Sequence, residues 1–185
     1  MELNQLNNEL FSIEHLTQDT DVSTFIVSKG KGLEYYLKST AKDDELDGVS
    51  RTYIIRRMDS NIIVAYFSLR TGLITVSRGL LSGFDTYTAI ELANFAVNDK
   101  ARIETNDVPK LGSYIFANFI LPLVQHISSL VGAKYLYIYA LPEVKLMSHY
   151  ETMGFQRINA KMEKFFYRHV KPLYDKGCIF MLQEI

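Results

Sequence analysis

An apolar stretch followed by a loop and a glycine-containing helix start is the part of the chain best suited to hold a phosphate. Residues 90–97 (IELANFAV) form the apolar stretch. The helix start consists of Leu111, Gly112, Ser113 and Tyr114. The first N–H groups of a helix have no intrahelical acceptor and lie at the positive end of the helix dipole, so they receive anions. The pattern therefore predicts a phosphate-bearing cofactor beside a strand.

Composition indicates one globular domain over residues 1–185. Hydrophobic residues make up 48% of the chain and charged residues 22%, and a chain of this length buries about 70% of its unfolded surface. The only cysteine, Cys178, cannot form a disulfide within the chain, and we expect it to be a buried structural thiol in a reducing cytoplasm. We expect neither a secretory signal nor a membrane span, because apolar runs are interrupted by charges or turn formers.

The charge is unevenly distributed although the net charge is only −1. Residues 1–50 hold ten acidic residues against four Lys and Arg, whereas residues 157–185 hold six Lys and Arg against three acidic residues. Four aromatic residues interleave with the basic ones: Phe165, Phe166, Tyr167 and Tyr174. This basic segment is either an ordinary solvated face or a contact for an anionic partner such as nucleic acid.

The hydrophobic periodicity predicts a mixed α/β order of elements. Strands are expected near residues 10–16, 51–57, 61–69 with 71–76, 88–97, 134–140 and 179–182. Helices are expected near residues 33–41, from 113 onward with a kink at Pro122, and at 144–152 with Gly154 as the C-cap. Loops are expected at residues 43–48, 82–85 and 98–110.

Three segments resemble the GNAT superfamily of acyl-CoA-dependent N-acyltransferases. Residues 92–98 (LANFAVN) resemble its central strand, residues 110–116 (KLGSYIF) the end of its pyrophosphate loop, and residues 148–155 (SHYETMGF) its late FYExxGF signature. The resemblance runs from near Phe25 to the last strand. It implies the GNAT fold, an α+β domain with a mixed, mostly antiparallel twisted sheet of about six to seven strands and helices on both faces.

A narrower resemblance concerns the branch that includes the acetylating toxins of bacterial toxin–antitoxin pairs, whose substrate is aminoacyl-tRNA. It rests on residues 33–37 (LEYYL), 50–54 (SRTYI) and 64–69 (VAYFSL). Family members that act on small amines or protein termini have comparable segments, and dedicated tRNA binders are often basic. The acceptor is therefore a small-molecule or peptide amine, with aminoacyl-tRNA as the alternative.

The loop departs from the family pattern Q/R-x-x-G-x-G/A. With Gly112 at the last glycine position, Lys110 takes the place of the first glycine and Asp107 the place of Gln or Arg. Glycine at this place lets the backbone approach the pyrophosphate closely. Lys110 therefore either blocks that approach or replaces it with a direct charge contact to phosphate.

The resemblance implies transfer of an acetyl group from acetyl-CoA, the co-substrate, to a primary amine by direct attack in a ternary complex. The strand Phe95, Ala96 and Val97 is expected to splay from its neighbour and pair with the pantetheine arm. The pyrophosphate is expected at Lys110 and at residues 111–114.

The transfer needs an acid for the departing thiolate and a base for the amine. Tyr150 matches the tyrosine that serves the family as the acid. Glu91, an ionisable residue in an apolar strand, is the candidate base through water, although strand alternation also allows it to face solvent or pair with an arginine. His149 is a second candidate base.

No HExxH, paired CxxC or GxSxG motif occurs, so we expect no metal site and no serine nucleophile. A homodimer is compatible with the sequence. A non-catalytic acyl-CoA-binding or interaction module on the same fold is the alternative to an enzyme, because a fold alone does not determine function.

Overall fold

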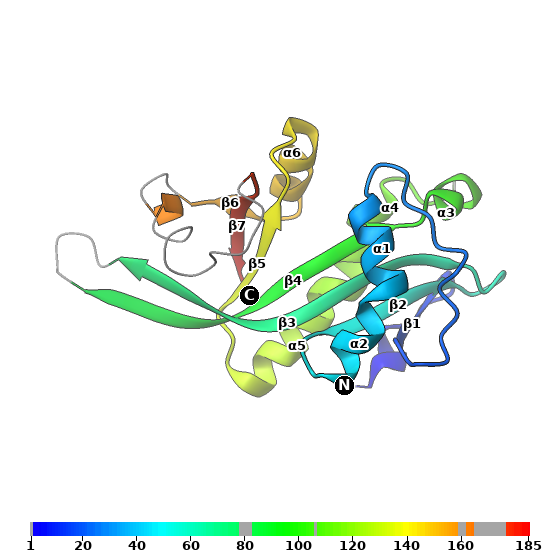
Figure 1. The fold of residues 1–185 in the computed structure, drawn as a ribbon, viewed down its shortest axis with the longest axis horizontal. Helices are drawn as coiled ribbons and strands as arrows, with labels where there is room; N and C mark the ends of the chain where they lie inside the picture. The colour runs from blue at the N-terminus through cyan, green and yellow to red at the C-terminus, as the bar shows by residue number, and fades with distance from the viewer. Residues whose placement is uncertain (1, 78–82, 106, 159–161, 165–176) are drawn as a thin grey trace. The chain divides into compact units, whose positions relative to one another are not determined.

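The computed structural model describes residues 2–77, 83–105, 107–158, 162–164 and 177–185 (Figure 1). Seven strands form one sheet in the order β1-β2-β3-β4-β5-β7-β6. The chain packs as two compact units, residues 1–70 with 92–126, and residues 71–91 with 127–185. Strands β3 and β4 run through both units, and the single-domain organisation stays a prediction.

The first unit contains the N-terminal strands and most of the helices. Its elements are η1 (Leu3–Leu6), β1 (Phe11–His15), α1 (Lys31–Ser39), α2 (Ala41–Leu46), β2 (Arg51–Arg57), the first half of β3 (Ile63–Ser77), the end of β4 (Phe84–Val97), α3 (Asp99–Glu104), α4 (Leu111–Ile115), the π-helical turn η2 (Phe116–Ile120) and the start of α5 (Leu121–Val131).

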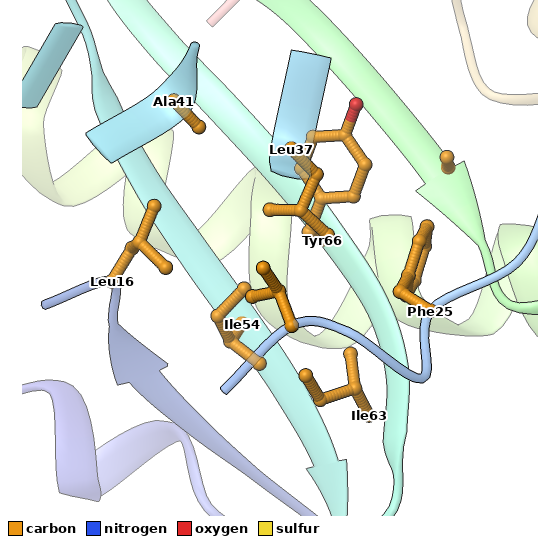
Figure 2. Close-up of a cluster of buried hydrophobic side chains, with 9 residues drawn as sticks. Leu16, Phe25, Leu37, Ala41, Ile54, Ile63 and Tyr66 are labelled. Atoms are coloured by element: carbon orange, nitrogen blue, oxygen red, sulfur yellow. The ribbon is translucent and has the colours of Figure 1, made fainter. Parts of the chain in front are cut away.

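Alternation along β2 sends its apolar side chains to two layers. Ile54, which pairs with Tyr66 of β3, belongs to a buried cluster under α1 and α2 (Figure 2). Its neighbour Ile55 points to the opposite face, where Phe11 of β1 packs against Phe119 of η2 with ring centroids 6.4 Å apart. Helices therefore cover both faces of the sheet in this unit, as the sequence predicts.

The helical region after α1 is longer than predicted. The loop predicted at residues 43–48 is wrong for residues 43–46, because α2 spans Ala41–Leu46. Asp43 and Asp44 lie in the first turn of α2, where the helix dipole stabilises negative charge. Asp44 also accepts a hydrogen bond of 2.9 Å from the Tyr36 hydroxyl, and Ala41 is fully buried. Tertiary contacts therefore fix a helix that composition alone did not indicate.

Two other predicted loops are also partly wrong. Residues 98–110 contain α3, which begins after Asn98 because the Asn98 side chain accepts a hydrogen bond from the N–H of Lys100. Phe84 and Asp85, predicted as loop, already belong to β4. Residue 82 lies outside the described residues. The predicted hairpin at residues 51–69 is confirmed, and β3 continues to Ser77 as the pattern at 71–76 indicated.

Residues 111–131 form one long helix whose middle is π-helical. The π-helical turn Phe116–Ile120 lies directly before Pro122, which has no N–H and would clash with the carbonyl one turn earlier. A kink of the helix at Pro122 stays a prediction. By length and composition alone, with a mean hydropathy of 1.4, this helix could cross a membrane. Its side chains Ile115, Phe119 and Val124 are fully buried within the protein, however, as in a core helix.

The second unit is built on the remaining strands. Its elements are β5 (Tyr135–Ala140), α6 (Val144–Thr152), β6 (Gln156–Arg157) and β7 (Ile179–Glu184), with the end of β3 and the start of β4. β4 pairs with β5 in parallel, whereas β7 pairs antiparallel with both β5 and β6. The core contains Ile74, Ala89, Tyr137 and Phe180, and Cys178 is buried as predicted.

The predicted basic C-terminal segment is only partly described. Arg157 forms an ion pair with Glu163 at 3.1 Å, which reduces its availability to an anionic partner. Lys161, Arg168, Lys171 and Lys176 and the four interleaved aromatic residues lie outside the described residues.

We predict that Leu37→Ala destabilises the first unit. Leu37 is fully buried in the cluster under α1 and α2, so its truncation leaves a cavity and lowers the free energy of unfolding by about 2–5 kcal/mol. Urea unfolding measures the change. The control is Leu46→Ala on α2, whose side chain is 71% exposed and which should change stability by less than about 0.5 kcal/mol. Equal effects of the two substitutions would contradict the assignment of the core.

Candidate functional site

Asn98 fixes the point at which β4 ends. Its N–H donates to the Val64 carbonyl at 2.8 Å and its side-chain amide donates to the Ile63 carbonyl at 2.8 Å. Its side-chain oxygen accepts from the N–H groups of Ile26 at 3.4 Å and Lys100 at 3.1 Å. Because Asn98 is 1% exposed, these bonds replace the water it has lost. One buried side chain therefore ties β4 to β3 and starts α3.

The proposed pantetheine strand lies just before Asn98. The parallel ladder between β4 and β5 covers Ala89–Glu91 of β4, so Phe95, Ala96 and Val97 lie beyond it. Ala96 and Val97 are buried and Phe95 is half-buried. Ala96 packs in the cluster under α1. The side chains of Ala96 and Val97 thus belong to the core, and the backbone is the part of these two residues that can contact a ligand.

The backbone of Lys110 adopts a conformation that is typical of glycine. Its φ of 54° and ψ of 48° place it in the left-handed region, which side chains with a Cβ avoid. Within the described residues, only Asn61 is another non-glycine residue with positive φ. Lys110 stands at the N-cap of α4, where the resemblance expects the first glycine of the pyrophosphate loop. The glycine conformation is therefore present without the glycine, and the lysine side chain is exposed.

Asp107 is held by an arginine fifty positions away in sequence. The Arg57 guanidinium donates from Nη1 to one Asp107 oxygen at 2.9 Å and from Nη2 to the other at 3.0 Å. These hydrogen bonds hold the pKa of Asp107 below its usual range and raise the pKa of Arg57. Nothing in the local sequence around either residue signals this pair, so it could not be predicted from the sequence.

Residues 111–114 form the first turn of α4, as predicted. Leu111 is buried, and Gly112, Ser113 and Tyr114 are half-buried. Tyr114 is anchored to the N-terminal segment, because its hydroxyl accepts from the Asn8 side chain at 3.3 Å and its ring lies 5.7 Å from that of Phe11. The N–H of Tyr114 donates to the Lys110 carbonyl at 3.1 Å, so its predicted contact with the pyrophosphate is wrong. The N–H groups of Leu111, Gly112 and Ser113 are the ones that the helix leaves without intrahelical acceptors.

Glu91 is buried on β4, with 2% of its surface exposed. Its carboxylate accepts a hydrogen bond of 2.9 Å from the Tyr137 hydroxyl, which comes from the directly paired position of β5. The alternative in which Glu91 faces solvent is therefore wrong. A buried carboxylate in a fixed hydrogen bond is held in one orientation, which suits either a base or a structural link between strands.

Gly72 of β3 provides the space for this arrangement. A Cβ at Gly72 would lie 2.1 Å from the Tyr137 hydroxyl oxygen, far inside van der Waals contact. Glycine is therefore required here by close approach, and not by its backbone angles. Gly72, Tyr137 and Glu91 thus form a three-strand contact within the second unit.

Tyr150 lies near the C-terminus of α6, and the helix cap there explains the spacing between Tyr150 and Phe155. The N–H of Phe155 donates to the Tyr150 carbonyl at 3.1 Å and the N–H of Gly154 to the Glu151 carbonyl at 3.0 Å, which is the Schellman pattern. Gly154 takes the left-handed conformation, with φ of 93°. The Tyr150 and Phe155 rings pack edge to face at 5.8 Å, the hydrophobic contact typical of this cap. The YExxGF spacing is therefore a complete helix stop.

The environment of Tyr150 keeps its hydroxyl protonated. The side chain is half-buried, and burial raises its pKa to about 12. Within the part of the chain that the structure describes, its hydroxyl makes no hydrogen bond to protein, so its proton is not engaged by an acceptor. His149, the second candidate base, lies next to Tyr150 with ring centroids 6.2 Å apart.

We predict that Gly72→Ala disturbs the Glu91 contact. The new methyl group must displace the Tyr137 hydroxyl, lowering the free energy of unfolding by about 1–3 kcal/mol. Combining it with Tyr137→Phe removes the nearest clashing atom, the hydroxyl oxygen, but leaves the ring carbons Cε1 and Cζ 2.8 Å from the new Cβ. The loss in the double variant should therefore be smaller than the sum of the two single losses. Urea unfolding of both single variants and of the double variant measures this. Gly32→Ala is the control, since a Cβ there meets no atom within 4 Å. Strict additivity would show that the two residues are not in contact.

Comparison with known proteins supports the fold. No protein-family model and no curated protein sequence matches the chain. Among solved structures, the toxin–antitoxin complex AtaTR bound with AcCoA is similar at 18% identity, with 94% of each chain covered and a TM-score of 0.67. AtaT complexed with acetyl-methionyl-tRNAfMet is similar at 17% identity, covering 92% of this chain and 93% of that one, with a TM-score of 0.65.

A bacterial toxin gives a TM-score of 0.70 at 13% identity, over 96% of this chain and 92% of that one. Identities this low establish shared architecture only. AtaT is a toxin acetyltransferase of the GNAT fold, and the mixed seven-stranded sheet with helices on both faces of its first half matches that architecture. The fold of the chain is therefore the GNAT fold, in the form found in the toxins AtaT and KacT.

Proposed function

We propose that the chain is an N-acetyltransferase that uses acetyl-CoA as its co-substrate. The observation that carries the proposal is the left-handed backbone of Lys110 at the start of α4. This is a backbone conformation that glycine adopts without steric cost, and it occurs at the position where the resemblance expects a glycine. The similarity in fold to AtaTR, which was solved with AcCoA bound, supports the same co-substrate.

The loop residues fit a pyrophosphate. In the left-handed conformation the backbone turns sharply into α4, so the first-turn N–H groups of Leu111, Gly112 and Ser113 can converge on an anion. The Lys110 side chain is exposed and can add a direct charge contact. Of the two alternatives for Lys110, the conformation favours the one in which the lysine contributes to binding. The backbone of Phe95, Ala96 and Val97 is proposed to hold the pantetheine arm.

The chain's own residues would handle two protons. The amine nitrogen attacks the thioester carbonyl carbon, a C–N bond forms, the C–S bond breaks, and the electron pair of that bond leaves on sulfur. Tyr150 donates its proton to the departing thiolate, which its raised pKa allows at any physiological pH. Glu91 accepts the amine proton through water, held in place by Tyr137.

The proposed acceptor is the α-amine of an aminoacyl-tRNA. The structure of AtaT with acetyl-methionyl-tRNAfMet supports this choice, since that ligand carries an acetylated α-amine. A small-molecule or peptide amine is the alternative acceptor. A reducing cytoplasm is the proposed compartment, and the similarity in fold to AtaTR supports an antitoxin as a protein partner.

A non-catalytic acyl-CoA-binding module is the competing function, favoured by the incomplete loop signature. Calorimetry with acetyl-CoA and a thiol-release assay with a panel of amines, including aminoacyl-tRNA, separate the two. The enzyme should bind acetyl-CoA and release thiol with at least one amine. Binding without release for every amine would favour the module, and no binding at millimolar acetyl-CoA would exclude the acetyltransferase.

We predict that Lys110→Gly weakens acetyl-CoA binding. Glycine keeps the left-handed backbone but loses the charge, and one charge-assisted hydrogen bond corresponds to about a 10- to 100-fold change in Kd. Lys110→Arg, which keeps the charge, is the matched control and should bind nearly as well as the native chain. Tighter binding by Lys110→Gly in calorimetry would mean that the lysine obstructs the pyrophosphate.

We predict that Tyr150→Phe lowers kcat by about 10²- to 10⁴-fold while leaving the Kd for acetyl-CoA unchanged. Because the pKa of Tyr150 is about 12, the native enzyme should show no alkaline loss of kcat from this group between pH 7 and 10. Steady-state rates across that pH range provide the measurement. Tyr35→Phe, an exposed tyrosine on α1, is the control. An unchanged kcat in Tyr150→Phe would remove Tyr150 from the mechanism.

A further inference from the structure

Arg57 and Asp107 connect the end of β2 to the segment that precedes Lys110. Arg57 is the last residue of β2, and its backbone pairs with Phe11 of β1. Asp107 stands three positions before Lys110, where the family resemblance expects Gln or Arg. The two side chains meet through two parallel N–H···O bonds of 2.9 and 3.0 Å, the geometry in which an arginine fixes a carboxylate most rigidly.

The arginine is itself immobilised before it reaches Asp107. Its Nε donates to both oxygens of Asp59, at 3.0 and 3.2 Å. Its guanidinium carbon lies 5.9 Å from the centre of the Phe11 ring, and the side chain is only 15% exposed. A side chain held by a carboxylate, an aromatic ring and a paired strand loses little further entropy when it binds Asp107.

The net charge around Arg57 indicates that the Arg57–Asp107 pair positions the loop and does not itself bind the pyrophosphate. One guanidinium faces two carboxylates, so the group of Arg57, Asp59 and Asp107 is net negative and does not attract a pyrophosphate. Asp107 without its partner would stand three residues before Lys110 as an uncompensated negative charge. Arg57 therefore both fastens the loop and neutralises a carboxylate that would repel the diphosphate of the co-substrate.

We propose that Arg57 is a positioning residue for acetyl-CoA: through Asp107 it holds the loop that leads into the left-handed Lys110 and masks the negative charge of that loop. The inference rests on the proposed acetyl-CoA site. Asp107 thus occupies a position where the family has Gln or Arg, which can contact the phosphate directly. In this chain the residue acts instead through its hydrogen bonds to Arg57 of the sheet.

The test compares Arg57→Gln with Arg56→Gln. Arg56 precedes Arg57 on β2, is similarly shielded at 17% exposure, and pairs with Glu14 at 2.7 Å. We expect Arg57→Gln to weaken acetyl-CoA binding about tenfold, and Arg56→Gln to leave it unchanged. Acetyl-pantetheine lacks the diphosphate, so its KM should have the native value in both variants. A general loss of structure would instead raise the KM for acetyl-CoA and the KM for acetyl-pantetheine together.

Two further measurements test the masking. The double variant Arg57→Gln with Asp107→Asn should bind acetyl-CoA more tightly than Arg57→Gln alone, because the unmasked carboxylate is gone. The tenfold difference between Arg57→Gln and the native chain should narrow as salt is raised, since salt screens the repulsion. Arg57→Lys keeps the positive charge and loses the two-point hydrogen bonding. It serves as the test variant if Arg57→Gln does not fold, and it should weaken acetyl-CoA binding by less than tenfold.

The outcomes separate the two proposals. If the native chain and Arg56→Gln bind acetyl-CoA and Arg57→Gln and Arg57→Lys bind equally well, the positioning role is overturned and the proposed function stands. A double variant that binds more weakly than Arg57→Gln would overturn the masking. If the native chain does not bind acetyl-CoA, the proposed function itself fails.

Discussion

The buried amide of Asn98 is the constraint on which the candidate site depends most. Three hydrogen bonds of this amide and one of the Asn98 backbone N–H join the residue to β3, to the segment before α1 and to the first turn of α3. A buried amide that lost one of these partners would leave a polar group unsatisfied, which costs about 1–3 kcal/mol. The end of β4 is therefore fixed where the chain turns toward the Lys110 loop. The position of that loop therefore depends on Asn98, a residue to which no chemical role in the transfer is assigned.

The parts of the fold that could be predicted are those whose causes are local. Helix α6 was placed at its observed bounds, because Gly154 and Phe155 complete a helix cap within five residues of Tyr150. The hairpin of β2 and β3 followed from β-branched runs around a short turn. Helix α2 was missed because its acidic sequence resembles a loop, and its stability comes from the Tyr36 hydroxyl and from burial of Ala41.

The candidate site divides in the same way. Tyr150 and Glu91 could be selected from the sequence as candidate acid and base, and the start of α4 could be located. The catalytic roles of the two residues stay proposals. The left-handed backbone of Lys110 could not be predicted, since a lysine in that region gives up local stability that the surrounding structure must supply. The Arg57 to Asp107 pair spans fifty positions, and the Tyr137 hydroxyl reaches Glu91 from the adjacent strand, 46 positions away in sequence. Such contacts have no signature in a single sequence.

The loop shows how a motif can vanish while its geometry persists. A glycine pattern is one way to obtain a left-handed turn before a helix, because glycine adopts that turn without steric cost. Anchoring the chain on both sides is another way, and here Asp107 is held to the sheet and Tyr114 to Asn8 and Phe11. The backbone between two fixed points then has few conformations left, and Lys110 can occupy one that lysine alone would avoid. In this chain the backbone angle at the position of the expected first glycine is therefore a better guide to the loop than the residue found there.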